Sequence, residues 1–594
     1  MIRFLYILIL FYAFSLNATE NSILTSSGTI SAQNKNGVLF YEDIPYAQPP
    51  VGSLRWKAPR EIKTTETEIQ PKKDNFCVQR PSNLGGVNSD EVFVGTEDCL
   101  YLDIHKPKKQ AKKLPVMFWI HGGGNTSGYK DIYDFSKMVK KYNVIVVRIN
   151  YRLGPFGWFY HPSIQNFQSG IDKSSNFGTL DIISALKWVN KNIELFGGDS
   201  NNITIFGESA GGHNVLSLLV SNNANGLFQK AISMSGYTTT INQEKAYRQD
   251  EHSSTSDFSS WNVVNMILDD KNQSSIQESY SKNELRDILM TLSTEDFFKH
   301  YSDRKSYQEL PLLQSDGIVI PEEGLRKALS NPKYMKDVPI IAGSTRDEVK
   351  LWLASAMYFV DIDYSILGTI FRVPKVTLKD EDAFNAFNYY RSSAWKIRGV
   401  DYPLQSIAKT GNTNLYAYRY DWDDHRKFFI ANFKKLIGAA HATEIPLLAS
   451  DYKLVGGYPL SDLIYPPSLS KRFTSKNLMK FWSNFAKESI PGESTNSIKW
   501  EPYDTNKSRN GKFLILDKKK EMQMSYDSNT FETLMDELYL DTRLNDLEKC
   551  VVLLQMLTYV GNDLYDEKSQ RYKGQCDRKV SEQFLIDNSS FIEY

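Results

Sequence analysis

The sequence predicts an α/β fold in which a large, mostly parallel sheet is covered by helices on both faces. Short apolar runs alternate with segments whose apolar residues recur at helical spacing. The runs are nearly continuous instead of alternating with polar residues, which is typical of parallel strands buried on both faces. Of the 594 residues, 41% are hydrophobic and 24% charged, which excludes a collagen-like repeat, a coiled-coil rod or a disordered chain.

The overall charge is balanced. Lys and Arg number 70, and so do Asp and Glu. A formal net charge of zero gives no overall attraction to nucleic acid or to an anionic membrane. The lysine-rich run 106–113 is therefore predicted to be a solvated face. With no internal repeat and no linker, residues 19–594 are expected to form a single domain, with a helical tail over 545–594.

The N-terminus has the pattern of an export signal. Arg3 precedes an apolar run over 4–16, and Asn17 and Ala18 lead into polar residues. This order predicts a cleaved signal peptide over 1–18 and a secreted or periplasmic protein. The alternative is a membrane anchor, but the run is shorter than the ~20 residues that a spanning helix needs.

Four cysteines are present: Cys77, Cys99, Cys550 and Cys576. An even number in an exported chain indicates disulfides, and Cys77 with Cys99 would close a local loop. Cys550 and Cys576 then either pair with each other, stay free or bridge two chains. None has a partner at the spacing of a zinc site, so no metal is expected.

The expected elements follow in chain order. Strands are predicted over 116–120, 143–149, 202–206, 230–233 and 338–341, and helices over 180–195 and 210–219. The run 551–560 is too short to cross a bilayer and is predicted to be a buried helix.

The most informative motif is G-x-S-x-G at 207–211, between the predicted strand ending at Phe206 and the helix beginning at Ala210. A serine on such a sharp strand-to-helix turn presents its hydroxyl above the sheet edge, and small neighbours let other backbone come close. Ser209 is therefore the candidate nucleophile. A glycine-rich turn without function is the alternative, and the flanking strand and helix argue against it.

A serine nucleophile needs donors for the developing oxyanion. The run His121-Gly122-Gly123-Gly124 directly follows the predicted strand 116–120. The backbone N–H groups of Gly123, Gly124 and Ala210 are the candidate oxyanion hole.

The serine also needs a base and an acid later in the chain. Of eight histidines, His441 lies in a stretch of small residues, whereas His252, His300 and His425 have polar neighbours and are expected at the surface. The strand end near 341 is followed by Asp347 and Glu348, and spacing alone does not choose between them.

Several long motifs together resemble the carboxylesterase/cholinesterase family (type-B carboxylesterases) of the α/β-hydrolase fold. They occur in order along nearly the whole mature chain, at 44–52, 54–56, 97–102, 150–155, 176–181 and 206–212. The resemblance implies Ser209 as nucleophile, His441 as base and Glu348 as acid. It also supports the Cys77–Cys99 disulfide and implies supporting roles for Glu208 and Ser235.

The sequence departs from the family pattern at three places. The loop between Cys77 and Cys99 has no Trp, which argues against recognition of a choline cation. Asn125 stands where many relatives have an aromatic residue, and its sequon with Thr126 and Ser127 is attributed to chance. His213 follows the serine turn and could either contact the pocket or lie at the surface.

We therefore expect an exported serine carboxylic-ester hydrolase that acts on small-molecule esters through an acyl-enzyme, without a cofactor. Because the base must be neutral, activity should fall below about pH 6.5. Alternatives are a lipase or amidase on the same scaffold, or a catalytically silent binding protein. The natural ester and the oligomeric state stay open.

Overall fold

The computed structural model describes residues 21–588, apart from the segments 64–66, 73–74, 83, 85–90, 111, 249–258, 272–276, 303–312, 364–374, 429–430, 453–460, 505–510 and 559–563. The predicted signal peptide over 1–18 and the surface position expected for His252 lie outside the described residues.

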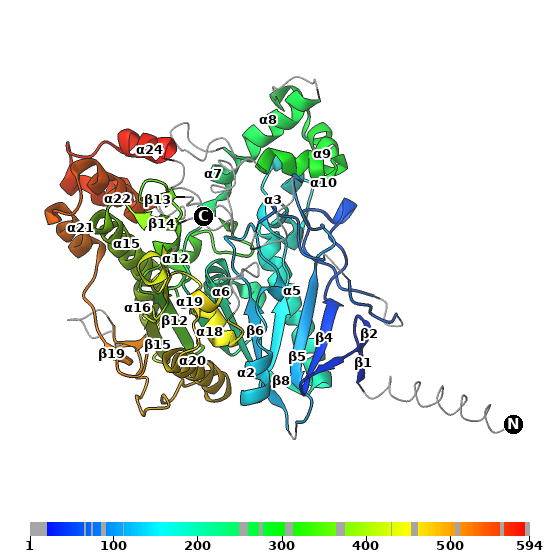
Figure 1. The fold of residues 1–594 in the computed structure, drawn as a ribbon. Coiled ribbons are helices and arrows are strands. Elements are labelled where there is room, and N and C mark those ends of the chain that lie inside the picture. Colours follow the sequence, from blue (N-terminus) through cyan, green and yellow to red (C-terminus); the bar gives the residue numbers. More distant parts are fainter. Residues whose placement is uncertain are drawn as a thin grey trace.

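An 11-stranded sheet forms the centre of the molecule (Figure 1). From one edge to the other its strands are β19 (Gln523–Ser525), β18 (Phe513–Leu516), β15 (Leu415–Tyr420), β12 (Ile340–Thr345), β9 (Lys230–Met234), β8 (Gly198–Glu208), β6 (Leu114–Ile120), β7 (Ile145–Ile149), β5 (Tyr101–Pro107), β4 (Val38–Pro45) and β3 (Gln33–Lys35). The strands from β18 to β7 are mutually parallel, and the four outer strands pair antiparallel.

The sheet separates two hydrophobic cores because neighbouring side chains of a strand point to opposite faces. In β6, Phe118 faces the first core and Trp119 the second. The first core is covered by α5 (Phe177–Asn192) and α6 (Ala210–Val220). The second is covered by helices on the other face: α2 (Ser136–Tyr142), α15 (Glu381–Lys396), α18 (Ile445–Ala449) and α20 (Leu469–Glu488).

Further helices lie outside these layers. A separate group near the top of Figure 1 consists of α8 (Ser260–Asp270), α9 (Lys282–Thr291) and α10 (Thr294–Phe298). The C-terminal part forms α21 (Phe531–Leu540), α22 (Asp546–Thr558), α23 (Tyr565–Lys568) and α24 (Arg578–Asp587). Shorter helices are α3 (Gly154–Gly157), α4 (Pro162–Gln165), α7 (Gln243–Tyr247), α12 (Gly324–Ala328), α13 (Lys350–Leu353), α16 (Tyr402–Ala408), α17 (Phe433–Leu436) and α19 (Ser461–Ile464).

Four small two-stranded sheets complete the secondary structure of the described residues. They pair β1 (Ser22–Thr25) with β2 (Gly28–Ser31), β10 (Ile241–Asn242) with β11 (Gln314–Ser315), β13 (Val360–Asp363) with β14 (Lys375–Leu378), and β16 (Lys427–Phe428) with β17 (Ala431–Asn432).

The predicted elements are present with shifted ends. The strands predicted over 116–120, 143–149, 202–206, 230–233 and 338–341 correspond to β6, β7, β8, β9 and β12, and the helices over 180–195 and 210–219 to α5 and α6. Helix α22 carries the run predicted from 551, and its final positions 559–560 lie outside the described residues. The buried strands were predictable because their apolar runs are unbroken.

Both cysteine pairs are disulfides in the structure: Cys77–Cys99 and Cys550–Cys576. Within the described residues no cysteine is free. The second disulfide ties α22 to the segment before α24, and α22 packs against α15. The tail is thereby attached to the body of the molecule.

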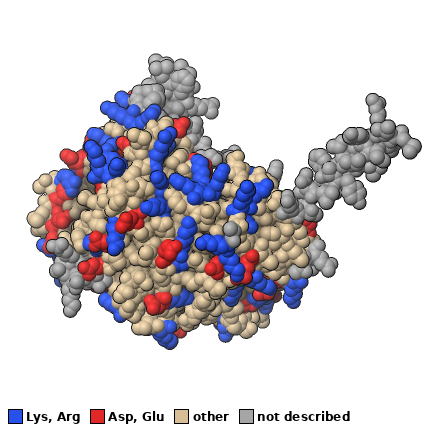
Figure 2. All heavy atoms as spheres, turned by 90° about the horizontal axis from the view of Figure 1, so that it is seen from below, with Lys and Arg blue, Asp and Glu red and all other residues tan. Residues whose placement is uncertain are grey.

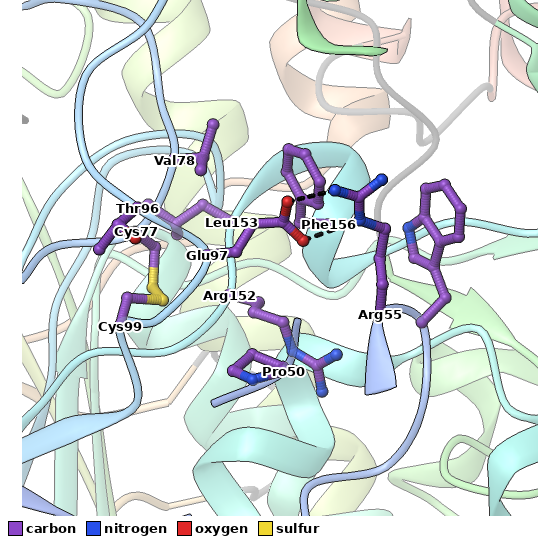
Figure 3. Close-up of a pocket in the computed structure, with 11 residues that line it drawn as sticks. Pro50, Arg55, Cys77, Val78, Thr96, Glu97, Cys99, Arg152, Leu153 and Phe156 are labelled. Atoms are coloured by element: carbon purple, nitrogen blue, oxygen red, sulfur yellow. Dashed lines mark hydrogen bonds and ion pairs between the residues drawn. A yellow bond between two sulfur atoms is a disulfide. The ribbon is translucent and has the colours of Figure 1, made fainter. Parts of the chain in front are cut away.

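Two ion pairs explain why charged residues occur in the N-terminal motifs. The Arg55 guanidinium faces the Glu97 carboxylate beside the Cys77–Cys99 disulfide (Figure 3), with Nε 2.8 Å from Oε2. Arg152 forms two hydrogen bonds of 2.7 Å to the buried carboxylate of Asp181. The hollow beside Arg55 measures about 10 Å³, which is room for about one water molecule. It is too small for an ester, so we assign the ion pair beside it to the stability of the fold.

None of the described helices combines the length and the apolar character that crossing a bilayer requires.

Candidate active site

Ser209 lies between the end of β8 and the start of α6, with φ 57° and ψ −121°. A non-glycine residue adopts such a backbone conformation only under constraint from its surroundings. Here the Ser209 N–H donates to the Met234 carbonyl at 2.8 Å, and the Ser209 carbonyl accepts from His213 N at 2.9 Å. Glu208 and Ala210 on either side are buried, while Ser209 stays partly exposed.

The glycines around Ser209 are required by close backbone contacts. A Cβ on Gly211 would lie 2.1 Å from the Ile120 carbonyl oxygen, and one on Gly207 would lie 2.6 Å from the Gly211 backbone. Real Cβ atoms do not approach so closely, so any larger residue would displace β6 from α6. The requirement for small residues beside the serine is confirmed.

The loop after β6 lies directly against the nucleophile. A Cβ on Gly122 would be 3.2 Å from Ser209 Cβ. Gly123 and Gly124 have φ values of 99° and 64°, which glycine adopts without strain. Among the described residues, the N–H groups of these two glycines donate to no other group. They are available to an external acceptor beside Ser209.

Asn125 holds this loop in place. Its side-chain oxygen accepts hydrogen bonds from Asn214 at 2.8 Å and from the Tyr151 hydroxyl at 3.3 Å, and its carbonyl accepts from Gly154 N at 2.8 Å. Asn125 is fully buried, so its sequon cannot carry a glycan in the folded protein. Asn125, which departs from the family pattern, thus supports the glycine loop through these hydrogen bonds.

Glu348 and His441 are joined by a short hydrogen bond. Glu348 Oε2 lies 2.6 Å from His441 Nδ1. The other carboxylate oxygen accepts from the Ser235 hydroxyl and from Thr345 N, each at 2.7 Å. These bonds fix the carboxylate, which in turn orients the imidazole through Nδ1.

Asp347 has different partners. Its carboxylate accepts from Ala439 N at 2.9 Å, from the Arg346 guanidinium at 2.7 Å and from Asn388 at 2.7 Å. Burial would raise the pKa of Asp347, but the charges of Arg346 and Lys350 and the hydrogen bonds from Arg346 and Ala439 together lower it. Of the two acids that the sequence left open, only Glu348 faces His441.

The other imidazole nitrogen faces a third carboxyl group. His441 Nε2 lies 3.0 Å from Glu208 Oε1, without the alignment of a hydrogen bond, and within the described residues it has no hydrogen-bond partner, Ser209 included. Burial alone would lower the pKa of His441, but the charges of Glu208 and Glu348 outweigh it and raise the pKa to about 9. Burial raises the pKa of Glu208 to about 7.

Aromatic rings and a further acid enclose the imidazole. The ring centroids of Trp352 and Trp395 lie 5.1 and 4.8 Å from that of His441. Glu444 is fully buried, and its pKa is raised well above the usual range by burial and by the neighbouring carboxylates of Glu208 and Glu348. The sequence did not reveal these tryptophans, because their contacts join elements far apart in the chain.

Three of the other histidines, His213, His300 and His425, make contacts within the fold and not with His441 or Glu348. His213 is buried, with Nε2 2.9 Å from the Thr239 carbonyl oxygen and its ring against Tyr237, so the surface alternative was wrong. The expected surface position of His425 was also wrong: both ring nitrogens lie within 2.7 Å of buried carbonyl oxygens. His300 is half-buried beside Asp270. Among the described residues, no group of His, Cys, Asp and Glu could hold a metal ion.

Comparison with known proteins identifies the family. The sequence model of the carboxylesterase family matches residues 19–393 and 395–534. The chain belongs to the carboxylesterase family. Its fold is the α/β-hydrolase fold, and the enzyme is a serine carboxylic-ester hydrolase.

Individual carboxylesterases are similar over most of their length. The para-nitrobenzyl esterase of Bacillus subtilis is 30% identical over 82% of this chain and 93% of its own, and the liver carboxylesterase of Sus scrofa is 30% identical over 79% and 84%. The solved structure of a thermophilic PNB esterase has a TM-score of 0.64 and 28% identity, over 86% of this chain and 98% of its own.

Proposed function

We propose that Ser209, His441 and Glu348 are the catalytic triad of this carboxylesterase, which hydrolyses small-molecule esters through an acyl-enzyme. The observation that carries the proposal is the 2.6 Å hydrogen bond between Glu348 and His441, at the same end of the sheet as the constrained Ser209. Because Nδ1 is committed to Glu348, Nε2 is the nitrogen left to exchange protons.

In the first half-reaction, Ser209 Oγ attacks the ester carbonyl carbon and His441 Nε2 takes the hydroxyl proton. The imidazole stays anchored to Glu348 while Nε2 turns from Glu208 to Ser209. The negative charge moves to the carbonyl oxygen, where Gly123, Gly124 and Ala210 donate N–H groups. The intermediate collapses, the bond to the alcohol oxygen breaks, and His441 returns the proton to that oxygen.

In the second half-reaction, water replaces the serine as the nucleophile. His441 takes a proton from water, the hydroxide attacks the acyl carbon, and the proton passes back to Ser209 Oγ as the carboxylic acid leaves. Glu348 stabilises the imidazolium in both steps. The atoms balance without a cofactor.

The test is Ser209→Ala with a p-nitrophenyl ester as substrate. Turnover should fall by roughly 10⁴-fold or more, since the remaining groups cannot form an acyl-enzyme. Ser330→Ala, which removes a hydroxyl bonded only to the Lys327 carbonyl, is the matched control and should stay fully active. A fluorophosphonate should label the native enzyme at Ser209. Full activity of Ser209→Ala would reject the triad.

A wider set of substrates for the native enzyme distinguishes an esterase from a lipase, an amidase or a catalytically silent protein. Initial rates across acyl-chain length would identify a lipase by a preference for long chains, and a preference for amides would identify an amidase. Absence of both turnover and fluorophosphonate labelling would favour a silent binding protein.

We also propose that the chain is exported. Two disulfides support this, because such bonds persist in oxidising compartments. N-terminal sequencing of protein from the expressing cells should find a start near Thr19 in the exported fraction. Recovery of the intact Met1 terminus from the cytosol alone would contradict export.

A further inference from the structure

Eight cationic side chains lie near one another at one end of the molecule. We call them the basic strip: Lys108, Lys109, Lys112, Lys140, Lys141, Arg472, Lys476 and Lys487. All are exposed, and none forms an ion pair with any described residue. Lysines elsewhere are commonly paired, for example Lys299 with Asp270 and Lys435 with Glu381. Other exposed lysines, such as Lys327, Lys333 and Lys409, also form no ion pair with a described residue, so the strip is distinguished by how close its cations lie to one another.

The strip is continuous across three segments. Helix α2 packs against α20, and the Tyr142 hydroxyl donates to the Lys476 carbonyl at 3.0 Å. Burial and the charge of Lys476 lower the pKa of Lys141. At the other end of α20, the pKa of Lys487 is lowered by burial and by the charge of Lys112, although Glu488 opposes this. Cations on different segments thus lie close enough to repel one another.

The loop before β6 closes the strip against α2. Lys108 N donates to the Gly37 carbonyl at 3.0 Å. A Cβ on Gly37 would in turn lie 3.9 Å from Lys140 Cε. Gly37 therefore joins the lysines of this loop to those at the end of α2.

The strip lies at the end of the sheet opposite the catalytic groups. The lysine loop precedes the first residue of β6, whereas the glycine loop beside Ser209 follows its last residue. A seven-residue strand separates the two ends by roughly 23 Å. Helices α2 and α20 lie low in Figure 1, and in the view from below groups of blue side chains stand among tan ones, with red ones scattered between them (Figure 2).

This accumulation is local. The whole chain has a formal net charge of zero, so attraction of a polyanion to this face cannot come from overall charge. Acidic side chains share this face: Glu194 pairs with Lys113, Glu488 adjoins Lys487, and Asp199 acts with Glu488 on Lys230. None of them forms an ion pair with a cation of the strip, so the strip keeps its positive charges available to an external anion.

We propose that the basic strip binds a sulfated polysaccharide. The α20 cations run from Arg472 to Lys487 along about 22 Å of helix, a shape suited to a linear chain with regularly spaced anions. The exposed large hydrophobic side chains near α20, Leu469 and Ile490, lie beyond the two ends of this stretch. Leu195, which follows Glu194 in the chain, is exposed as well, so the large apolar side chains around the strip are single residues on different segments and not a continuous face that would insert into a bilayer. A chain bound there leaves the catalytic end open.

The test measures binding of a fluorescent heparin dodecasaccharide to the full-length enzyme by anisotropy at low salt. The variant carries Lys112→Gln, Lys141→Gln, Lys476→Gln and Lys487→Gln. The control carries Lys72→Gln, Lys299→Gln, Lys379→Gln and Lys435→Gln, which remove the same charge from lysines paired elsewhere. We expect the strip variant to bind at least about tenfold more weakly and the control within about twofold of the native enzyme. All three should hydrolyse p-nitrophenyl esters equally.

Three outcomes would overturn the proposal. The first is failure of the native enzyme to bind the dodecasaccharide. The second is equal weakening of binding in both variants, which would show that the strip is not the site. Binding to phosphatidylserine vesicles without binding to the dodecasaccharide would assign the strip to a lipid surface instead. Because ester hydrolysis is measured separately, a failure here does not affect the proposed triad.

Discussion

The imidazole of His441 lies between two carboxyl groups with different tasks. Glu348 holds Nδ1 through a hydrogen bond, whereas Glu208 faces Nε2, the nitrogen that accepts the serine proton in the proposed mechanism. Both charges favour the imidazolium and raise the pKa of His441 to about 9, against the effect of burial. Since only the neutral ring can act as a base, this raised pKa moves the lower limit of the active pH range above the expected value of about 6.5.

The first prediction concerns Glu208. Glu208→Gln removes the charge that faces Nε2, so the pKa of His441 should fall. The acid limb of the kcat/KM profile should then move by about one pH unit toward lower pH. Profiles of p-nitrophenyl ester hydrolysis between about pH 6 and 10.5, corrected for spontaneous hydrolysis, measure this. An acid limb at the same pH in both enzymes would show that Glu208 does not set the titration of the base.

The second prediction concerns Gly123. In Gly123→Ala the new Cβ would lie 2.2 Å from the Ser127 carbonyl oxygen, so the loop must move and its N–H group loses its position. Loss of one oxyanion donor lowers kcat by about 10²- to 10³-fold. We expect a fall of this size for the same ester.

The control is Gly411→Ala. Gly411 has φ 96°, close to the 99° of Gly123, but a Cβ there meets nothing within 4 Å. Gly411→Ala should lower the free energy of unfolding by about 1 kcal/mol and leave kcat unchanged. Equal losses of activity in both variants would attribute the effect to backbone strain alone.

Some residues of the candidate site could be predicted from local sequence patterns, whereas others depend on tertiary contacts that the sequence does not show. Ser209 and the glycines were predictable because each is dictated by its own turn. The residues alone could not decide between Glu348 and Asp347. The decision depends on Arg346 and Asn388, which bind the carboxylate of Asp347. His425 was misplaced because its chain neighbours Asp424 and Arg426 are charged, while its ring turns inward to two carbonyl groups.

At the scale of elements, apolar runs identified five adjacent strands, β12, β9, β8, β6 and β7, and missed β15 and β18 beside them as well as the four outer strands. Strand β5 contains Asp103 and His105, which are buried because Arg148 and Lys130 accompany them. Charged residues interrupt the apolar pattern there, and their partners come from other segments. Sequence alone therefore does not distinguish such a strand from a loop.

The third prediction concerns the C-terminal tail. Cys550→Ser with Cys576→Ser opens a loop with a sequence separation of 26 residues, which should lower the free energy of unfolding by about 3.5 kcal/mol in the chain-entropy model. Urea denaturation measures the loss. Activity at 25 °C should persist, because α22 stays packed against α15 through buried side chains such as Leu553 and Leu557. An unchanged denaturation midpoint would show that this packing alone secures the tail.

At the scale of the whole molecule, the balance of charges sets colloidal behaviour. The sequence pI is about 7.1, and proteins associate most readily where their net charge vanishes. The fourth prediction is therefore a solubility minimum near pH 7, measured by polyethylene glycol precipitation between about pH 5 and 9. Addition of salt near pH 7 should raise solubility if contacts between the basic strip and acidic faces of neighbouring molecules contribute. A minimum far from pH 7 would show that patches, and not net charge, dominate.

The position of Glu208 bears on how a catalytic cycle finishes. In the proposed mechanism each turnover generates a new anion, the carboxylate of the product, at Ser209, and the preceding residue Glu208 carries a carboxyl group that is ionised above its pKa of about 7. Like charges at close range push the product outward, so emptying the pocket is assisted by the same side chain that steadies the imidazolium. Inhibition by the released acid should consequently deepen as the medium is made more acidic.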